Sequence, residues 1–140
     1  MEERKLAETA SEKGRVKAGA WLCGLLAWAV PGAGHLWAGR ILSGLLLGGA
    51  VWTMYALGLL LGGHLFSLFN STTGLLSYVF GLFNLGAGLL YVASRALEIG
   101  AIDQAERATA EYGNVFLMVA GLLNYLLALD AFDIRAGRKS

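Results

Sequence analysis

The chain has 140 residues, of which 56% are hydrophobic and only 15% are charged, and its formal net charge is +1. A soluble chain usually carries roughly 25% charged residues, and a net charge so close to zero excludes an electrostatic grip on nucleic acid. No Asp, Glu, Lys or Arg occurs between Ile41 and Ser94, which excludes a small water-soluble domain and indicates a chain embedded in a lipid bilayer.

Charges of both signs fill residues 1–17, which we interpret as a polar N-terminal tail or solvated helix. Five of the 11 basic residues precede Trp21, and a second basic tail occupies residues 135–140. Because Lys and Arg accumulate on the cytoplasmic side of membrane proteins, the N-terminus is predicted to be cytoplasmic. The same rule gives equal basic counts for three and for four spans, so it leaves the number of spans open.

Four apolar blocks predict helices at about 18–30, 34–66, 74–94 and 113–131, within one transmembrane domain over residues 18–134. A spanning helix needs roughly 20 mostly apolar residues, and the last three blocks reach that length. The first block, at 13 residues from Ala18 to Val30, makes only about 20 Å of helix. We predict an all-α integral membrane bundle of four hydrophobic helices, with three spans plus one re-entrant segment as the alternative.

The longest polar connection covers residues 94–112. Its apolar residues, among them Leu97, Ile99 and Ile102, alternate irregularly with charged residues such as Asp103 and Glu106. This pattern predicts a short amphipathic helix at the membrane surface.

The most distinctive run joins the first two blocks and reads P-G-A-G-H-L-W-A-G-R, with Gly44 one turn later. Proline tends to end a helix, and glycines allow a tight turn. A tryptophan suits the lipid–water interface, and an arginine near a helix end can extend its charge into water. The run therefore predicts an anchored helical hairpin, and a headgroup or partner site built by His35, Trp37 and Arg40 is the alternative. The hairpin residues are Pro31, Gly32, Gly34, His35, Trp37, Gly39 and Arg40.

This run, written P-G-x-G-H-x-W-x-G-R-x-x-x-G between two apolar helices, resembles the two-transmembrane-helix domain family and its bacterial relatives. The resemblance covers about residues 20–60, and the remaining blocks resemble an extension found in bacterial membrane proteins of uncharacterised function. It implies a helical hairpin in a bacterial inner membrane, and it implies no reaction, because that family has no common activity. His35-Leu36-Trp37 stands where animal members carry an Asp-Arg-Phe type of triplet, so no role of that triplet is carried over.

Small and polar residues recur at regular spacing in the last three blocks. In lipid, small residues let helix backbones approach closely, and polar residues hydrogen-bond between helices. We therefore predict helix-packing faces, with Asn124 paired to Asn84, and a polar path is the alternative. The residues concerned are Gly44, Gly48, Gly58 and Gly62 in the second block, Gly74, Ser77, Gly81, Asn84, Gly88 and Tyr91 at seven-residue spacings in the third, and Gly121 and Asn124 in the fourth.

Asp130 and Asp133 end the fourth block beside Arg135. Their position predicts salt bridges at the membrane surface, and an ion-coupling role is the alternative because acids within a membrane are often functional. The chain has no nucleophile–base arrangement, no phosphate-binding loop after a strand, and no metal-ligand spacing near either histidine. We expect no catalytic residue, no cofactor and no metal site, and we do not expect an enzyme.

The function favoured by these patterns is that of a structural or accessory membrane subunit. It would act by helix–helix packing with itself or with a larger membrane complex, so its expected partners are the lipid bilayer and other membrane helices. The alternative is a small oligomeric channel or transporter whose polar path is lined by Ser77, Asn84 and Asn124.

Overall fold

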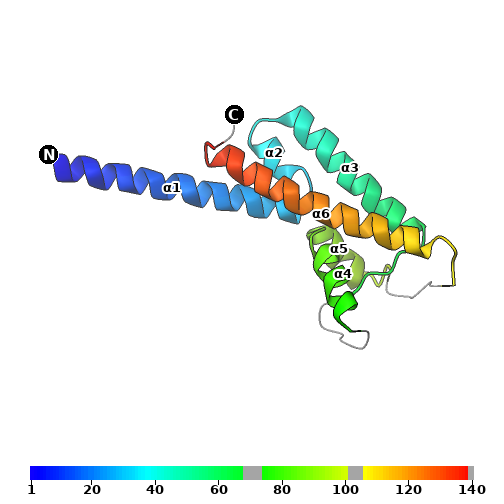
Figure 1. Cartoon of the computed structure of the whole chain (residues 1–140). Helices are drawn as coiled ribbons and strands as arrows, with labels where there is room; N and C mark the ends of the chain where they lie inside the picture. The colour runs from blue at the N-terminus through cyan, green and yellow to red at the C-terminus, as the bar shows by residue number, and fades with distance from the viewer. Residues whose placement is uncertain (68–73, 101–105, 139–140) are drawn as a thin grey trace.

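The computed structural model describes residues 1–67, 74–100 and 106–138, and within them every regular element is a helix. The all-α prediction is therefore confirmed for the described residues. The helices are α1 (Glu2–Ala29), α2 (Ala33–Trp37), α3 (Ile41–Leu60), α4 (Leu75–Leu85), α5 (Leu89–Ala96) and α6 (Ala110–Arg135) (Figure 1).

Helix α6 is the centre of the bundle, and α1 and α3 both pack along it in the opposite chain direction. Helix α4 lies against α6, and α5 lies against α4 and α1, near the point where α1 ends (Figure 1). The main apolar core joins Val51 and Tyr55 of α3 to Leu117, Ala120 and Leu127 of α6. The N-terminal half of α1 projects beyond the bundle.

Two helices, α3 with 20 residues and α6 with 26, are long and apolar enough to cross a membrane. Helices α4 and α5 meet the same test only as a pair, and they are bent by 111° at the break between them. The described chain thus has two candidate spans, or three if the bent pair is one broken span, in place of the four hydrophobic helices expected. The first apolar block is not a helix of its own, because it continues the charged segment before it as the end of α1.

The continuous helix expected over 74–94 is wrong, because the chain bends between Leu85 and Leu89. Gly88 has φ +62°, and a Cβ at this position would collide with the carbonyl oxygen of Trp28. The bend therefore brings the backbones of α1 and α5 into direct contact. It also separates Gly88 and Tyr91 from the α4 residues, so the seven-residue repeat does not form one helix face.

The helix expected over 34–66 is also two helices, α2 and α3. Gly39, with φ +82°, lies between them. Helix α3 ends in a Schellman motif, in which Gly63 N–H donates to Gly58 C=O and Gly62 N–H donates to Leu59 C=O. Gly62 takes the left-handed conformation at φ +89° that this motif requires.

The amphipathic helix expected over 94–112 falls partly outside the described residues, which omit 101–105. Of the described part, α5 runs to Ala96 and α6 begins at Ala110, and the residues next to the gap form turns or bends.

Several of the expected packing glycines are used inside the chain. Gly44 and Gly48 of α3 face the backbone of Pro31 and Gly32, and Gly58 faces Leu117 and Gly113 of α6. The G-x-x-x-G pairs therefore contribute to the fold of one chain. Gly74, by contrast, is exposed, and a Cβ added there would meet no described atom within 4 Å.

Gly34 gives the sharpest test of this packing. A Cβ at Gly34 would lie 2.5 Å from Cβ of Ala27 and 2.8 Å from Cβ of Ala131, so we expect Gly34→Ala to lower the free energy of unfolding by about 1–3 kcal/mol. Gly49→Ala is the control, because nothing lies within 4 Å of its Cβ position, and it should be neutral or stabilising by up to about 1 kcal/mol. Unfolding of the purified protein by SDS in mixed micelles measures both, and equal effects would contradict the packing described.

Candidate functional site

The candidate site forms where α2 enters the bundle between α1, α3 and α6. Helix α1 ends at Ala29, and Pro31 follows, which cannot continue the hydrogen-bond ladder of a helix. Gly32 then turns the chain at φ +90°, where a Cβ would collide with the carbonyl oxygen of Gly44. The turn expected at Pro31–Gly34 is present, but it is buried against α3 instead of lying at a wet surface.

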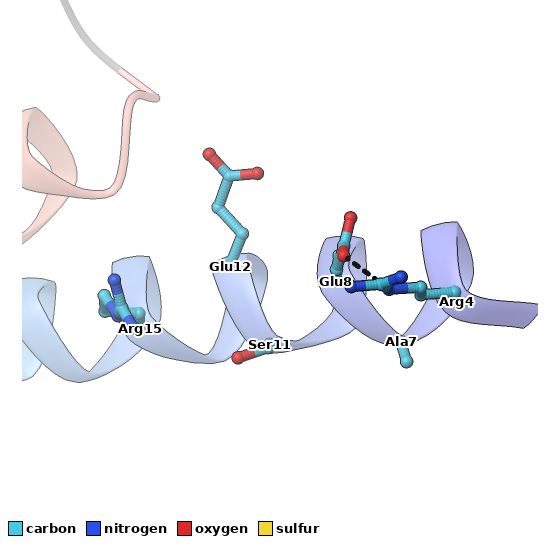
Figure 2. A pocket seen from close by; sticks show the side chains of 6 residues that line it. All are labelled: Arg4, Ala7, Glu8, Ser11, Glu12 and Arg15. Carbon is cyan, nitrogen blue, oxygen red and sulfur yellow. Dashed lines mark ion pairs between the residues drawn. The ribbon is translucent and has the colours of Figure 1, made fainter.

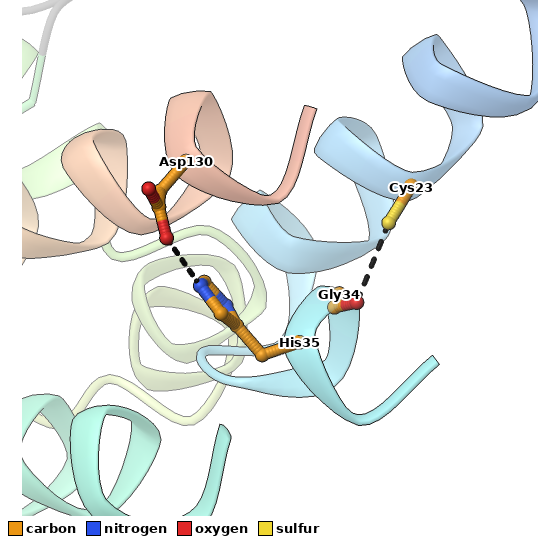
Figure 3. A network of polar contacts seen from close by, with 4 residues as sticks. All are labelled: Cys23, Gly34, His35 and Asp130. Carbon is orange, nitrogen blue, oxygen red and sulfur yellow. Dashed lines mark hydrogen bonds and ion pairs between the residues drawn. The ribbon is translucent and has the colours of Figure 1, made fainter. Parts of the chain in front are cut away.

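His35 of α2 points into the bundle and contacts Asp130 of α6, as Figure 3 shows. Its Nε2 lies 2.8 Å from Asp130 Oδ2, and the side chains are 1% and 28% exposed, respectively. Helix α2 positions the histidine, and the last turns of α6 position the acid, 95 residues away in the sequence. The arrangement differs from the expected interfacial site, because His35 is buried and Asp130 reaches inward.

The chemistry of the pair follows from the tautomer of the ring. With a neutral ring that carries its proton on Nε2, His35 donates to the Asp130 carboxylate and Nδ1 is left as an acceptor. Nδ1 is buried and has no hydrogen-bond partner among the described residues. The pair therefore joins α2 to α6 by a side-chain hydrogen bond.

The other members of the hairpin motif do not join His35. Trp37 lies on the outer side of α2 and is 55% exposed, as expected for a ring at the lipid–water interface. Arg40 is the residue just before α3 and is partly buried. The structure therefore does not assemble one surface site from His35, Trp37 and Arg40.

The two acids of α6 have different environments. Asp133 Oδ1 lies 3.6 Å from Arg138 Nη1, and both side chains are largely exposed. Asp130 reaches the interior, whereas Asp133 stays at the end of the bundle.

Asn124 forms a second polar junction deeper in the bundle. Its Nδ2 donates to the carbonyl of Trp28 at 2.7 Å and to the carbonyl of Gly86 at 2.8 Å. One of these carbonyls belongs to the last turn of α1 and the other to the break between α4 and α5. Asn124 thus ties two interrupted segments to the continuous helix α6.

The predicted pairing of Asn124 with Asn84 is wrong. Both amide hydrogens of Asn124 are used by backbone carbonyls, and Asn84 Nδ2 and Asn124 Oδ1 are buried without a hydrogen-bond partner in the described part of the chain. Ser77, Asn84 and Asn124 are nevertheless all buried, as interior packing residues would be.

Two polar contacts of the bundle, one at the site and one at the far end of α3, were missed by the sequence prediction. Cys23 Sγ donates to the carbonyl of Gly34 at 3.3 Å, which links α1 to α2 (Figure 3). The side chain of Asn114 accepts a hydrogen bond from His64 N–H at 2.7 Å, which fixes the chain just after α3. The only signal in the sequence was general, since a polar side chain in an apolar segment needs a partner.

Within 1–67, 74–100 and 106–138, no group of three or more His, Cys, Asp or Glu side chains could hold a metal ion. The polar contacts instead join helices to one another.

Fold and site together define a helical protein with two candidate membrane spans, or three with the bent pair, built around one central helix with buried polar junctions. The chain belongs to a family of unknown function (DUF6677), whose model matches residues 22–140. No curated protein and no solved structure matches it. The matched range contains α2 to α6 and the packed end of α1, and it leaves out the charged part of α1.

The His35–Asp130 contact can be measured by a double-mutant cycle. Asp130→Leu leaves a buried imidazole without its partner and should lower the free energy of unfolding by about 1–3 kcal/mol. In the double variant His35→Leu/Asp130→Leu the loss should be smaller than the sum of the single losses, by about 0.5–3 kcal/mol. SDS unfolding in mixed micelles gives the four free energies.

Asp133→Leu is the control for this cycle. It breaks only an exposed ion pair, so its combination with His35→Leu should be additive, and its own cost should stay below about 1 kcal/mol. Additive losses for His35 and Asp130 would show that the contact does not couple the two helices.

Proposed function

We propose that this chain is a multi-pass protein of the bacterial inner membrane that serves as a structural or accessory subunit and not as an enzyme. It packs through its helices with itself or with a larger membrane complex, and its N-terminus lies in the cytoplasm. The projecting half of α1 is the observation that carries this proposal.

Helix α1 has 28 residues and is about 42 Å long. Every residue from Met1 to Ala18 is exposed, and Gly19 is the first that is partly buried. A helix that is polar on all sides usually bridges to another domain or is not stable alone. The exposed half of α1, which we call the arm (residues 2–18), is thus a helix that a partner outside the bilayer can hold.

Figure 2 shows the side chains along one face of the arm. Arg4 Nε lies 3.5 Å from Glu8 Oε1 in an exposed ion pair one turn apart. The shallow recess beside them is lined by residues of α1 alone, so it has only one wall and cannot enclose a small molecule. Mixed charges along an open helix suit a partner surface that also carries both signs.

The arm is continuous with the packed end of α1. Ala20, Cys23 and Ala27 are buried, and α2 and α6 hold this end from two sides. Because one unbroken helix joins both parts, a partner bound to the arm would be held at a fixed position relative to the bundle.

The buried polar residues favour packing over a channel. A polar path would need Ser77, Asn84 and Asn124 to face water, and their exposed fractions are 6%, 2% and 0%. Large apolar side chains such as Leu45, Leu60 and Leu75 are exposed instead, as lipid-facing side chains would be.

Deletion of residues 2–14 tests the accessory role. The native complex, extracted from membranes in mild detergent, should be larger than a single chain, and the deletion should reduce it to the size of the isolated bundle. Size-exclusion chromatography with light scattering measures the mass, and purified wild-type protein shows whether self-association accounts for it. Arg107→Ala is the control, because it removes one exposed basic side chain outside the arm. An unchanged mass after the deletion would contradict the proposal.

The bundle also supports a definite topology. Gly19 of α1 lies beside Arg135 at the end of α6, and His35, just before α3, contacts Asp130 near the same end. Helix α1 with α2 therefore enters and returns on one side, and α3 and α6 make the two crossings. Nine of the 11 basic residues precede Ile41 or follow Ile134, and this side is cytoplasmic by the positive-inside rule.

Single cysteines in a Cys23→Ala background test this topology. In intact cells a membrane-impermeant maleimide should label Glu111→Cys at the opposite end of α6, and it should not label Ser11→Cys or Gly137→Cys. All three should react after the membrane is permeabilised, which controls for accessibility. Labelling of Gly137→Cys from outside would mean an odd number of crossings and would contradict the arrangement.

A further inference from the structure

An apolar groove runs along the outside of the bundle between α1 and α6. Its volume is about 600 Å³, within the roughly 300–1,000 Å³ of pockets that hold small molecules and cofactors. Large side chains form its walls and small residues form its floor. Its lining residues are Trp21, Gly24, Leu25 and Trp28 of α1 and Tyr125, Ala128, Leu129 and Phe132 of α6.

The groove exists because the two helices approach closely at a small residue. A Cβ on Gly24 would lie 3.3 Å from Cβ of Phe132, so a larger residue here would fill the floor. The rings of Trp21 and Phe132 meet edge to face, with centroids 5.1 Å apart, at one end of the groove. Trp28 and Tyr125 lie further into the bundle, seven residues along each helix. The groove is therefore a slot that begins near the charged end of the bundle and runs inward.

Basic residues of both helices lie near the outer end of this slot. The guanidinium of Arg138 lies 5.9 Å from the centroid of the Phe132 ring. Arg135 follows Phe132 by one turn and shares a smaller cleft of about 240 Å³ with Arg15. Lys17 precedes Trp21 by four residues on the same face of α1. Asp133 contacts this group through an ion pair with Arg138.

We propose that the groove binds an anionic phospholipid of the surrounding bilayer. One acyl chain lies in the slot between α1 and α6, and the phosphate lies among Arg135, Arg138 and Lys17. Basic pockets between membrane helices on the cytoplasmic side attract anionic headgroups, and this rim lies on the side proposed above to be cytoplasmic. The inference goes beyond the accessory role and shares with it only the placement in the membrane.

The shape of the groove favours a lipid chain over a partner helix. Helices associate in membranes through small residues that let their backbones approach. Here the walls carry Trp21, Trp28 and Tyr125, which would hold another helix away from the floor. A flexible acyl chain can follow the slot between these rings, and the cationic rim complements a phosphate.

Tryptophan quenching by brominated lipids tests the proposal directly. The chain has four tryptophans, and Trp37→Phe/Trp52→Phe leaves only the two in the groove. Brominated phosphatidylglycerol and brominated phosphatidylcholine are titrated separately into the purified protein in detergent micelles. We expect the anionic lipid to quench at about thirtyfold lower concentration, the scale that two basic residues give near an anionic surface.

Two double variants with the same loss of charge separate the rim from general electrostatics. Arg135→Gln/Arg138→Gln should abolish the preference for phosphatidylglycerol, whereas Arg4→Gln/Arg107→Gln should retain it. Gly24→Leu should weaken quenching by both lipids, because its side chain fills the floor of the slot.

Equal quenching by the two lipids in the wild type, or a preference that survives loss of Arg135 and Arg138, would overturn the proposal. So would cross-linking of Trp21→Cys to a second copy of the chain that shields the groove from both lipids. Flotation with phosphatidylcholine vesicles separates this failure from that of the proposed function. If the chain inserts but shows no lipid preference, only the proposed lipid site is wrong. If the chain fails to insert, the lipid site and the proposed membrane role are both wrong.

Discussion

The fold depends on hydrogen bonds to the backbone carbonyls that are left without a helical partner where two helices are interrupted inside the bundle. In lipid every backbone N–H and C=O group must find a partner within the protein, and each one left unsatisfied costs several kcal/mol. Helix α1 stops at Ala29, and the chain breaks again between Leu85 and Leu89. Asn124 donates its two amide hydrogens to one backbone carbonyl from each interruption. Since Asn124 lies on the unbroken helix α6, both interruptions are held at the same place.

The close backbone contacts at this junction explain why several positions in the bundle are glycine. For one side chain to reach Trp28 and Gly86 together, three backbones must approach more closely than a Cβ would allow. A Cβ at Gly88 would collide with the carbonyl oxygen of Trp28, and a Cβ at Gly121 would collide with the carbonyl oxygen of Phe83. Gly34 is needed for the same reason beside the His35–Asp130 contact, where a Cβ would collide with Ala27 of α1 and Ala131 of α6. These glycines are thus occupied by contacts inside one chain, and large apolar side chains form the walls of the α1–α6 groove.

The sequence predicted the features that depend on composition and local chemistry. The absence of charge from Ile41 to Ser94 indicated a membrane bundle, and Pro31 with its neighbouring glycines indicated a turn. It failed where a local pattern had two structural meanings. The seven-residue spacing of Gly74, Gly81 and Gly88 fits a continuous helix as well as it fits a helix broken at Gly88. Only the contact with Trp28 shows that Gly88 belongs to a bend. His35 and Asp130 each indicated a surface role when considered alone, since nothing local links residues 95 positions apart.

Helix α1 connects the three regions on which both proposals depend. Its apolar end, from Ala18 to Ala29, is too short to cross a hydrocarbon core of about 30 Å. It ends inside the bundle, where Asn124 donates a hydrogen bond to the carbonyl of Trp28 in its last turn. In the proposed topology this short end keeps the arm at the membrane surface, and Gly19 lies beside Arg135 of the antiparallel α6. The arm, Lys17 of the rim and one wall of the groove are therefore parts of one helix, and Asn124 ties the end of that helix to α6. A longer α1 that crossed the bilayer would carry Trp21 and Lys17 away from the end of α6, and it would leave neither the groove nor its rim in place.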